Sequence, residues 1–335
     1  MEKFIAELIQ DTSAIRKINI LEMLIESGEF ISSKFMAKQL QCTNRTIIND
    51  ISHLKTIIHT NLEIISVKSK GYFIKKNFPV NSSCIISYYL SKSEIYKILI
   101  NIFKYKEYTL EKWSQLLYLN KLTLRKKLKM FENSIQNFRV SFNFRKLQLV
   151  GNELNVRCFY IYYFYIISKY TETIDLNSHL KQKINRISHR YKFEIDHNLL
   201  AIIINVLIHR ITHKQYIPKE FKFEYELKKD KYNYINSLVL EIEHFYQINL
   251  SKHEKDFFIL SFWLISEANI NEKVSFYKLH SKDNIIIYNR TISLLKIISR
   301  KIKLDLNTKE RIKYELFFIN YKFYTLRKKI YRFHF

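Results

Sequence analysis

The chain has 335 residues, of which 47% are hydrophobic, enough to form buried cores, so its composition excludes a globally disordered protein. Lysine and arginine exceed aspartate and glutamate by 25, and this excess favours a polyanionic partner such as nucleic acid. The excess of lysine, isoleucine and asparagine is also typical of an AT-rich genome, so part of the charge is codon drift. Cys42, Cys84 and Cys158 lie far apart and indicate neither a metal site nor a disulfide framework.

Residues 14–28 carry apolar side chains at helical spacing and predict the first helix of a three-helix core, ended by Gly28. Residues 31–40 predict a short helix that breaks at a polar turn. A further helix is expected to start after Thr43, whose hydroxyl can accept a hydrogen bond from a first-turn N–H. One face of this helix is an apolar stripe of Ile47, Ile51, Leu54 and Ile58.

The opposite face of the same helix is short and polar and begins at the helix N-terminus, the end that a recognition helix inserts into the major groove. Residues 62–67 and 72–74 then predict a hairpin with a basic tip at residues 68–71. The pattern is typical of a winged helix–turn–helix, which indicates binding to double-stranded DNA. The candidate DNA contacts are Thr43, Asn44, Arg45, Ile48, Asn49, Ser52, Lys68 and Lys70.

A second, weaker copy of this pattern follows 77 residues later. Trp113 corresponds to Met36, Asn120 to Thr43, and a hairpin is expected over residues 139–144 and 147–150. The outward face of its second helix is more basic, so we expect it to bind mainly phosphate groups. Its candidate contacts are Lys121, Arg125, Lys126 and Lys129, with Leu122 beside them.

From residue 152 onward the pattern is helical, and the fold class is therefore mainly α: two winged helix–turn–helix domains followed by a helical bundle. Pro79 marks the linker between the two modules. The expected domains are residues 1–77, 84–151, 152–270 and a partial segment at 271–335. The expected helices lie at 153–170, 177–191, 197–215, 231–248, 251–268, 284–303 and 307–330.

The aromatic helices of the second half predict self-association, because we expect them to leave a large apolar surface uncovered. The longest apolar run, residues 158–167, is too short to span a bilayer. Base stacking by its tyrosines is an alternative to packing in a core or a dimer. The aromatic residues expected to form the self-association surface are Phe159, Tyr160, Tyr163, Phe164, Phe257, Phe258, Phe262 and Trp263.

Two stretches resemble a known family. Residues 43–54 with Lys70-Gly71-Tyr72 look like the N-terminal winged helix of the Mga/AtxA family of virulence regulators from Gram-positive bacteria. Residues 147–153, leading into 157–159, are similar to that family's second DNA-binding domain and its junction with the regulatory half. Members of that family have two helical PTS-regulation domains and a C-terminal IIB-like part, and the IIB-like part is expected to be lacking in this sequence. The resemblance covers residues 14 to about 270, whereas the second regulatory domain is expected to be cut short.

The resemblance also implies phosphorylation on histidine, with phosphotransferase-system proteins as partners. The best match is Asn205–His213, where His209 and His213 share a helix face and Arg210 with nearby lysines would meet the phosphate. Both histidines can equally be ordinary side chains, and a two-histidine metal clip would lack a third ligand. The other histidine expected of such a domain is replaced by aromatics, apart from His253 just before that helix. Control by phosphorylation is then reduced or lost.

The sequence shows no phosphate loop, HExxH motif or nucleophile elbow, so we expect no enzyme, no metal and no cofactor. No signal peptide or membrane segment is visible, and a cytoplasmic location is expected. The leading prediction is a dimeric transcription regulator that binds AT-rich promoter DNA, an activator of virulence or surface genes. The alternatives are a truncated paralogue acting as an interaction or decoy subunit, and a plasmid replication or maintenance protein that binds DNA.

Overall fold

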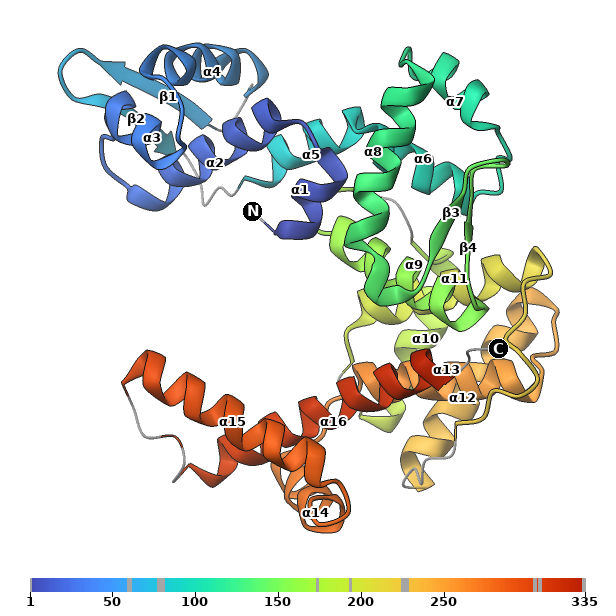
Figure 1. The fold of residues 1–335 in the computed structure, drawn as a ribbon. Helices are drawn as coiled ribbons and strands as arrows, with labels where there is room; N and C mark the ends of the chain where they lie inside the picture. Colours follow the sequence, from blue (N-terminus) through green and yellow to red (C-terminus); the bar gives the residue numbers. More distant parts are fainter. Residues whose placement is uncertain are drawn as a thin grey trace. The chain divides into compact units, whose positions relative to one another are not determined.

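The computed structural model of the chain describes residues 2–58, 62–76, 82–172, 175–192, 195–223, 229–303, 306 and 309–332. The described residues are mainly α-helical, as predicted, and their strands form two short hairpins (Figure 1). The chain divides into two compact units. Unit 1 contains residues 1–151 and 162–173, and unit 2 contains residues 152–161 and 174–335.

Unit 1 begins with the predicted winged helix–turn–helix. The first core helix starts at Asp11, whose carboxylate accepts hydrogen bonds from the N–H groups of Ser13 and Ala14, and ends at Gly28 with φ 63°. The elements of this module are α2 (Thr12–Ser27), α3 (Ser33–Gln39), α4 (Asn44–Ile57), β1 (Leu62–Val67) and β2 (Gly71–Lys76).

The first wing is the antiparallel pair β1–β2, extended by a bridge from Ile31. The N–H of Ile31 donates to Tyr72 O at 2.8 Å, and the N–H of Tyr72 donates to Ile31 O at 2.9 Å. Gly71 makes this close approach possible. It has φ 105°, and a Cβ there would lie 2.3 Å from the carbonyl oxygen of Ile31. The hairpin is therefore joined to the segment that precedes α3.

The second module repeats the first at the predicted spacing. Its α7 (Leu110–Leu116) and α8 (Lys121–Ser134) begin and end 77 residues after α3 and α4. Even the left-handed turn residue recurs, at Gln41 (φ 51°) and Tyr118 (φ 53°). The wing is less regular than predicted, because β3 (Ser141–Asn143) and β4 (Gln148–Val150) are only three residues long. The module is completed by α5 (Ser83–Lys92), α6 (Glu94–Phe103) and the 3-10 turn Gln136–Phe138.

A helix that the sequence analysis did not predict, α1 (Lys3–Ile9), contacts both modules. Its side chains Phe4, Ile5, Leu8 and Ile9 are buried. The Oγ of Ser93, between α5 and α6, donates to Leu8 O at 2.5 Å. Directly after α1, the Nε2 of Gln10 donates to the backbone oxygen of Lys127 in α8 at 3.0 Å. The N-terminal segment thus ties the two winged modules together.

Unit 2 is a helical bundle. Its helices are α9 (Glu153–Ile167), α10 (Ser178–Tyr191), α11 (His197–Thr212), α12 (Lys229–Tyr246), α13 (Lys252–Ile265), α14 (Ile270–His280), α15 (Ile285–Ile302) and α16 (Glu310–Arg332). Aliphatic and aromatic side chains from α10 to α13 form its main core, with a smaller cluster around Phe276 and Phe317. Helix α9 is shared, since residues 153–161 belong to unit 2 and the rest to unit 1. Helix α14 was not predicted, although Asn269 and Glu272 form a capping box at its start.

The predicted apolar surface of the aromatic helices is wrong. All eight aromatic residues named for it are at most 3% exposed, because they pack inside the chain rather than on its outside. Tyr163, for example, is completely buried, and its hydroxyl donates to Tyr96 O at 3.3 Å. These side chains are therefore core residues and form neither a stacking platform for bases nor a dimer surface. No helix in the described part of the chain is long and apolar enough to cross a membrane.

Candidate nucleic-acid interface

The outer face of α4 carries the residues predicted to contact DNA, and all of them are exposed. The helix starts as expected, since the Thr43 hydroxyl accepts a hydrogen bond from the N–H of Thr46 at 3.1 Å. Ile48 lies on this outer face as well and is 44% exposed. Arg45 and Asn49 make no side-chain hydrogen bond or ion pair with any described residue. Their polar groups are free to meet a ligand.

The inner face of α4 holds the helix in place. Ile47, Ile51 and Leu54 are at most 1% exposed, as the predicted stripe requires. Between them lies Asp50, which is 5% exposed and which the sequence analysis did not single out. Its position between the apolar residues of the stripe could have indicated a buried carboxylate from the sequence alone.

Asp50 pairs with two cations of α2. The Nε of Arg16 donates to its Oδ2 at 2.5 Å, and the Nζ of Lys17 lies 3.4 Å from its Oδ1. The hydrogen bond to this carboxylate raises the pKa of Arg16. A buried carboxylate is destabilising without partners, so these two ion pairs fix the position of α4 against α2.

The second module keeps this ion pair with the charges exchanged. Counting 77 residues on, Lys127 takes the place of Asp50, and Glu94 takes the place of Lys17. The Nζ of Lys127 lies 2.7 Å from Glu94 Oε2. Both recognition helices are therefore anchored to the equivalent core helix at the same point, which supports the interpretation of the two modules as a structural repeat.

The wing tip of the first module is basic and exposed. Lys68 and Lys70 flank Ser69, which has φ 80°, and both lysine side chains point into solvent. Lys55 was not among the predicted contacts; its Nζ donates to Ser66 Oγ in β1 at 2.8 Å. The end of the recognition helix is thus linked to the wing.

In the second module the predicted basic residues also lie on the outer face of the recognition helix. Arg125 and Lys129 rest over the ring of Phe144 in the wing, with their charged groups 5.1 and 5.4 Å from its centroid. Lys121 pairs with Glu111 at 3.4 Å, but both side chains are more than half exposed, so water and salt weaken this pair. Lys126 is exposed and unpaired among the described residues. This surface offers several cations to a phosphate backbone.

Unit 2 contains the predicted histidine pair at the end of α11. The rings of His209 and His213 stack with centroids 4.6 Å apart. The Nδ1 of His213 lies 2.8 Å from the backbone oxygen of His209. Since a carbonyl oxygen can only accept, Nδ1 is the donor in this contact. His213 is exposed and His209 is half-buried. His253 lies in the first turn of α13, one position inside the helix rather than before it.

The prediction that Arg210 would meet a phosphate group is wrong, because its side chain is buried and bound to Glu153. Its Nε and Nη2 donate to the two carboxylate oxygens of Glu153 at 2.9 and 2.6 Å. Glu153 also accepts from Arg157, which is fully buried and donates two hydrogen bonds to Glu254 and one to the backbone oxygen of Gln215. This network joins α9, α11 and α13 by long-range partners that sequence spacing does not reveal.

Among the described residues no group of three or more histidine, cysteine, aspartate or glutamate side chains could hold a metal ion.

Comparison with known proteins agrees with this geometry. Residues 16–73 match the HTH domain family, and residues 79–164 match the Mga helix-turn-helix domain. The first match covers the first winged module. The second covers the other module and most of α9. Each match therefore places a helix–turn–helix where the structure has one.

Over most of its length the chain is similar to regulators of Bacillus anthracis. It is 24% identical over 320 residues to the capsule synthesis positive regulator AcpA, which is 89% of this chain and 64% of AcpA. It is 22% identical to the capsule synthesis positive regulator AcpB (90% of this chain, 64% of AcpB) and to the anthrax toxin expression trans-acting positive regulator (88% and 63%). The chain spans under two thirds of the length of these relatives. The chain is thus similar to these positive regulators over most of its length, and its residues 79–164 match the Mga helix-turn-helix domain.

Proposed function

We propose that this chain is a transcription regulator that reads promoter sequence with α4 and binds the DNA backbone with α8 and the two wings. The observation that carries the proposal is the doubled winged helix–turn–helix, in which both recognition helices are anchored by buried faces and leave polar or basic outer faces exposed. The relatives are positive regulators, so activation is the direction we propose. The base composition of the target, AT-rich DNA, remains part of the proposal.

The division of labour between the modules follows from side-chain chemistry. A guanidinium can donate two hydrogen bonds to guanine, and an amide can accept from N6 and donate to N7 of adenine, so Arg45 and Asn49 suit base readout. Ile48 beside them can contact a thymine methyl group. The outer face of α8 offers lysine and arginine instead, and such side chains gain most of their affinity from phosphate groups irrespective of sequence.

The readout by α4 is tested with Arg45→Ala in a footprint and affinity measurement on promoter DNA at physiological salt. We expect a loss of about 1–3 kcal/mol at a specific site and much less on random DNA. Arg290→Ala, an exposed arginine of α15, is the matched control and should change neither affinity. Equal losses on both DNAs would show that Arg45 binds only phosphate.

The role of α8 is tested with the triple variant Lys121→Ala, Arg125→Ala, Lys126→Ala. Each phosphate contact that is removed should flatten the plot of log affinity against log salt by about one unit. The control is the triple variant Lys296→Ala, Arg300→Ala and Lys301→Ala, which removes the same charges from α15. An unchanged slope for the α8 variant would remove the second module from the interface.

Regulation through unit 2 is the finer part of the proposal. His213 is the more exposed of the two histidines, and its Nδ1 is held against the backbone oxygen of His209, so we propose Nε2 of His213 as the phosphoryl acceptor ahead of the half-buried His209. Phosphotransferase-system proteins are the proposed donors. Transfer of labelled phosphate to the wild type but not to His213→Gln supports the assignment, and equal labelling of both contradicts it.

Self-association of the full chain also remains a proposal, and it cannot use the eight buried aromatic residues. Analytical ultracentrifugation at micromolar concentration separates a dimer from a monomer. A monomer that binds DNA poorly would favour the interaction or decoy subunit, whereas strong binding without a promoter preference would favour a plasmid replication or maintenance protein.

A further inference from the structure

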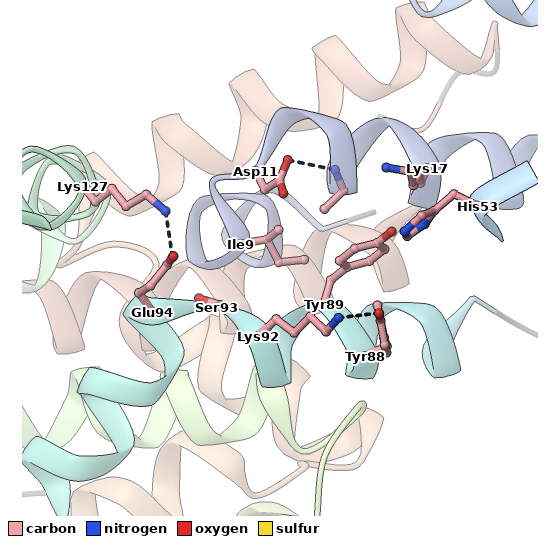
Figure 2. A pocket seen from close by; sticks show the side chains of 11 residues that line it. Ile9, Asp11, Lys17, His53, Tyr88, Tyr89, Lys92, Ser93, Glu94 and Lys127 are labelled. Atoms are coloured by element: carbon pink, nitrogen blue, oxygen red, sulfur yellow. Dashed lines mark hydrogen bonds and ion pairs between the residues drawn. The ribbon is translucent and has the colours of Figure 1, made fainter. Parts of the chain in front are cut away.

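A cavity of about 300 Å³ lies inside unit 1, where helices of the two winged modules meet (Figure 2). Its walls come from α2 and α4 of the first module, from α5, α6 and α8 of the second, and from α1, which binds both. This volume is at the lower end of the range of small-molecule sites in proteins. The cavity therefore has room for a compact ligand.

One wall of the cavity contains a polar group that the fold leaves unsatisfied. Tyr89 is 9% exposed, and its hydroxyl has no hydrogen-bond partner among the described residues. A buried hydroxyl without a partner is destabilising, and such groups are uncommon in native proteins. Burial raises the pKa of Tyr89 to about 12, so the phenol keeps its proton and can donate. Figure 2 shows this hydroxyl pointing toward His53.

Two basic side chains of the cavity, Lys92 and His53, are less well paired than its acids. The ammonium of Lys92 donates to the Tyr88 hydroxyl and lies 4.1 Å from the centre of that ring, but it pairs with no acid of the described residues. The imidazole of His53 makes no hydrogen bond with a described residue. By contrast, the carboxylate of Asp11 caps α2, and that of Glu94 pairs with Lys127.

Lys17, the remaining charged group of the lining, pairs with Asp50 behind it. The groups left over are therefore donors: one phenol, one ammonium and one imidazole. Oxygen atoms of an anion would satisfy all three, while the rings of Tyr88 and Tyr89 and the side chain of Ile9 offer apolar contact to a small carbon skeleton.

We propose that this cavity is a binding site for a small organic anion, with one carboxylate or phosphate group bound by Tyr89, Lys92 and His53. Both recognition helices contribute to its wall, α4 through His53 and α8 through Lys127. A bound anion would stabilise one arrangement of the two modules and so alter DNA affinity. The site is independent of base readout, and a failure of Arg45→Ala to affect DNA binding would leave it unchanged.

The test is isothermal titration of the full chain at constant ionic strength with three probes: phenyl phosphate, benzoate and uncharged phenol. We expect one-site binding of at least one anion and none of phenol. Tyr89→Phe and Lys92→Met should each weaken that binding about tenfold or more, the loss of one hydrogen bond to a charged group. The matched controls Tyr216→Phe and Lys296→Met, both at exposed positions, should bind as the wild type does.

A second measurement separates a binding role from a structural one. Without ligand, Tyr89→Phe removes an unsatisfied hydroxyl and should raise the melting temperature. With the anion bound to the wild type, this gain should vanish or reverse. The proposal is overturned if neither anion binds at up to about 10 mM. It is also overturned if the pocket variants bind as tightly as the controls, or if phenol binds equally well. Full displacement of the anion by duplex DNA would assign the site to a DNA phosphate instead.

Discussion

Replacing Asp50 by asparagine should loosen the first recognition helix from its module. The substitution preserves side-chain volume and one acceptor oxygen but removes the charge that faces Arg16 and Lys17. The two cations would then be held close together at the α2–α4 contact with no anion between them. We therefore expect loss of stability in unit 1 and no effect on the stability of unit 2.

The size of the loss follows from burial. Removing one partner of a buried ion pair costs about 3–5 kcal/mol. The side chains of Arg16 and Lys17 are 23% and 12% exposed, so water recovers part of this cost. We expect about 3 kcal/mol, a large part of the 5–15 kcal/mol that stabilises a typical domain.

The chain provides its own reporters for this assay, since its two tryptophans are buried in different units, Trp113 in unit 1 and Trp263 in unit 2. Urea unfolding followed by Trp113 fluorescence in a Trp263→Phe background should show the loss, whereas Trp263 in a Trp113→Phe background should not. Asp283→Asn, at an exposed position, is the control.

The charge exchange between modules gives a rescue variant. Arg16→Ser, Lys17→Glu and Asp50→Lys together copy the residues of the second module onto the first, and should recover at least half of the lost free energy. A loss below about 1 kcal/mol for Asp50→Asn, within the range of an exposed pair, would refute the argument that this contact seats α4.

Two further predictions concern the wing and unit 2. Gly71→Ala should lower the stability of the first module more than Gly28→Ala, because a Cβ at Gly71 would lie 2.3 Å from Ile31 O whereas nothing lies within 4 Å at Gly28. Hydrogen exchange of the β1 and β2 amides should accelerate only in Gly71→Ala, and equal exchange in the two variants would contradict this. Burial, with the charges of Lys231 and Lys273, lowers the pKa of Lys322 from 10.5 to about 8, so the folded chain loses this proton at a lower pH than the unfolded chain does. The resulting penalty is complete below pH 8 and declines as the pH rises toward 10.5, so the stability of the wild type relative to Lys322→Met should increase over this interval in urea titrations followed by Trp263; a constant difference would contradict the shift.

Local features of the sequence sufficed to predict the helix–turn–helix pairs. Thr43 and Asn120 are N-caps that act within three residues, and the apolar stripe of α4 needs only its own helical period. The repeat at 77 residues added a second, independent copy of the same signals. For this reason α7 and α8 lie where the correspondence placed them, while the short strands β3 and β4, which depend on pairing register, were only roughly anticipated.

The sequence alone also specified the outer faces of α4 and α8, because a residue opposite an apolar stripe must face away from the core. Tertiary structure decided what no periodicity encodes: the partner of each buried charge and the neighbour of each aromatic ring. Arg210 is adjacent to His209 in sequence, yet its guanidinium binds Glu153, 57 residues away. Aromatic runs predict an apolar surface but not its cover, and here the other helices of the chain supply that cover. Such contacts depend on how distant segments pack, where many pairings are sterically possible and only the complete core selects one.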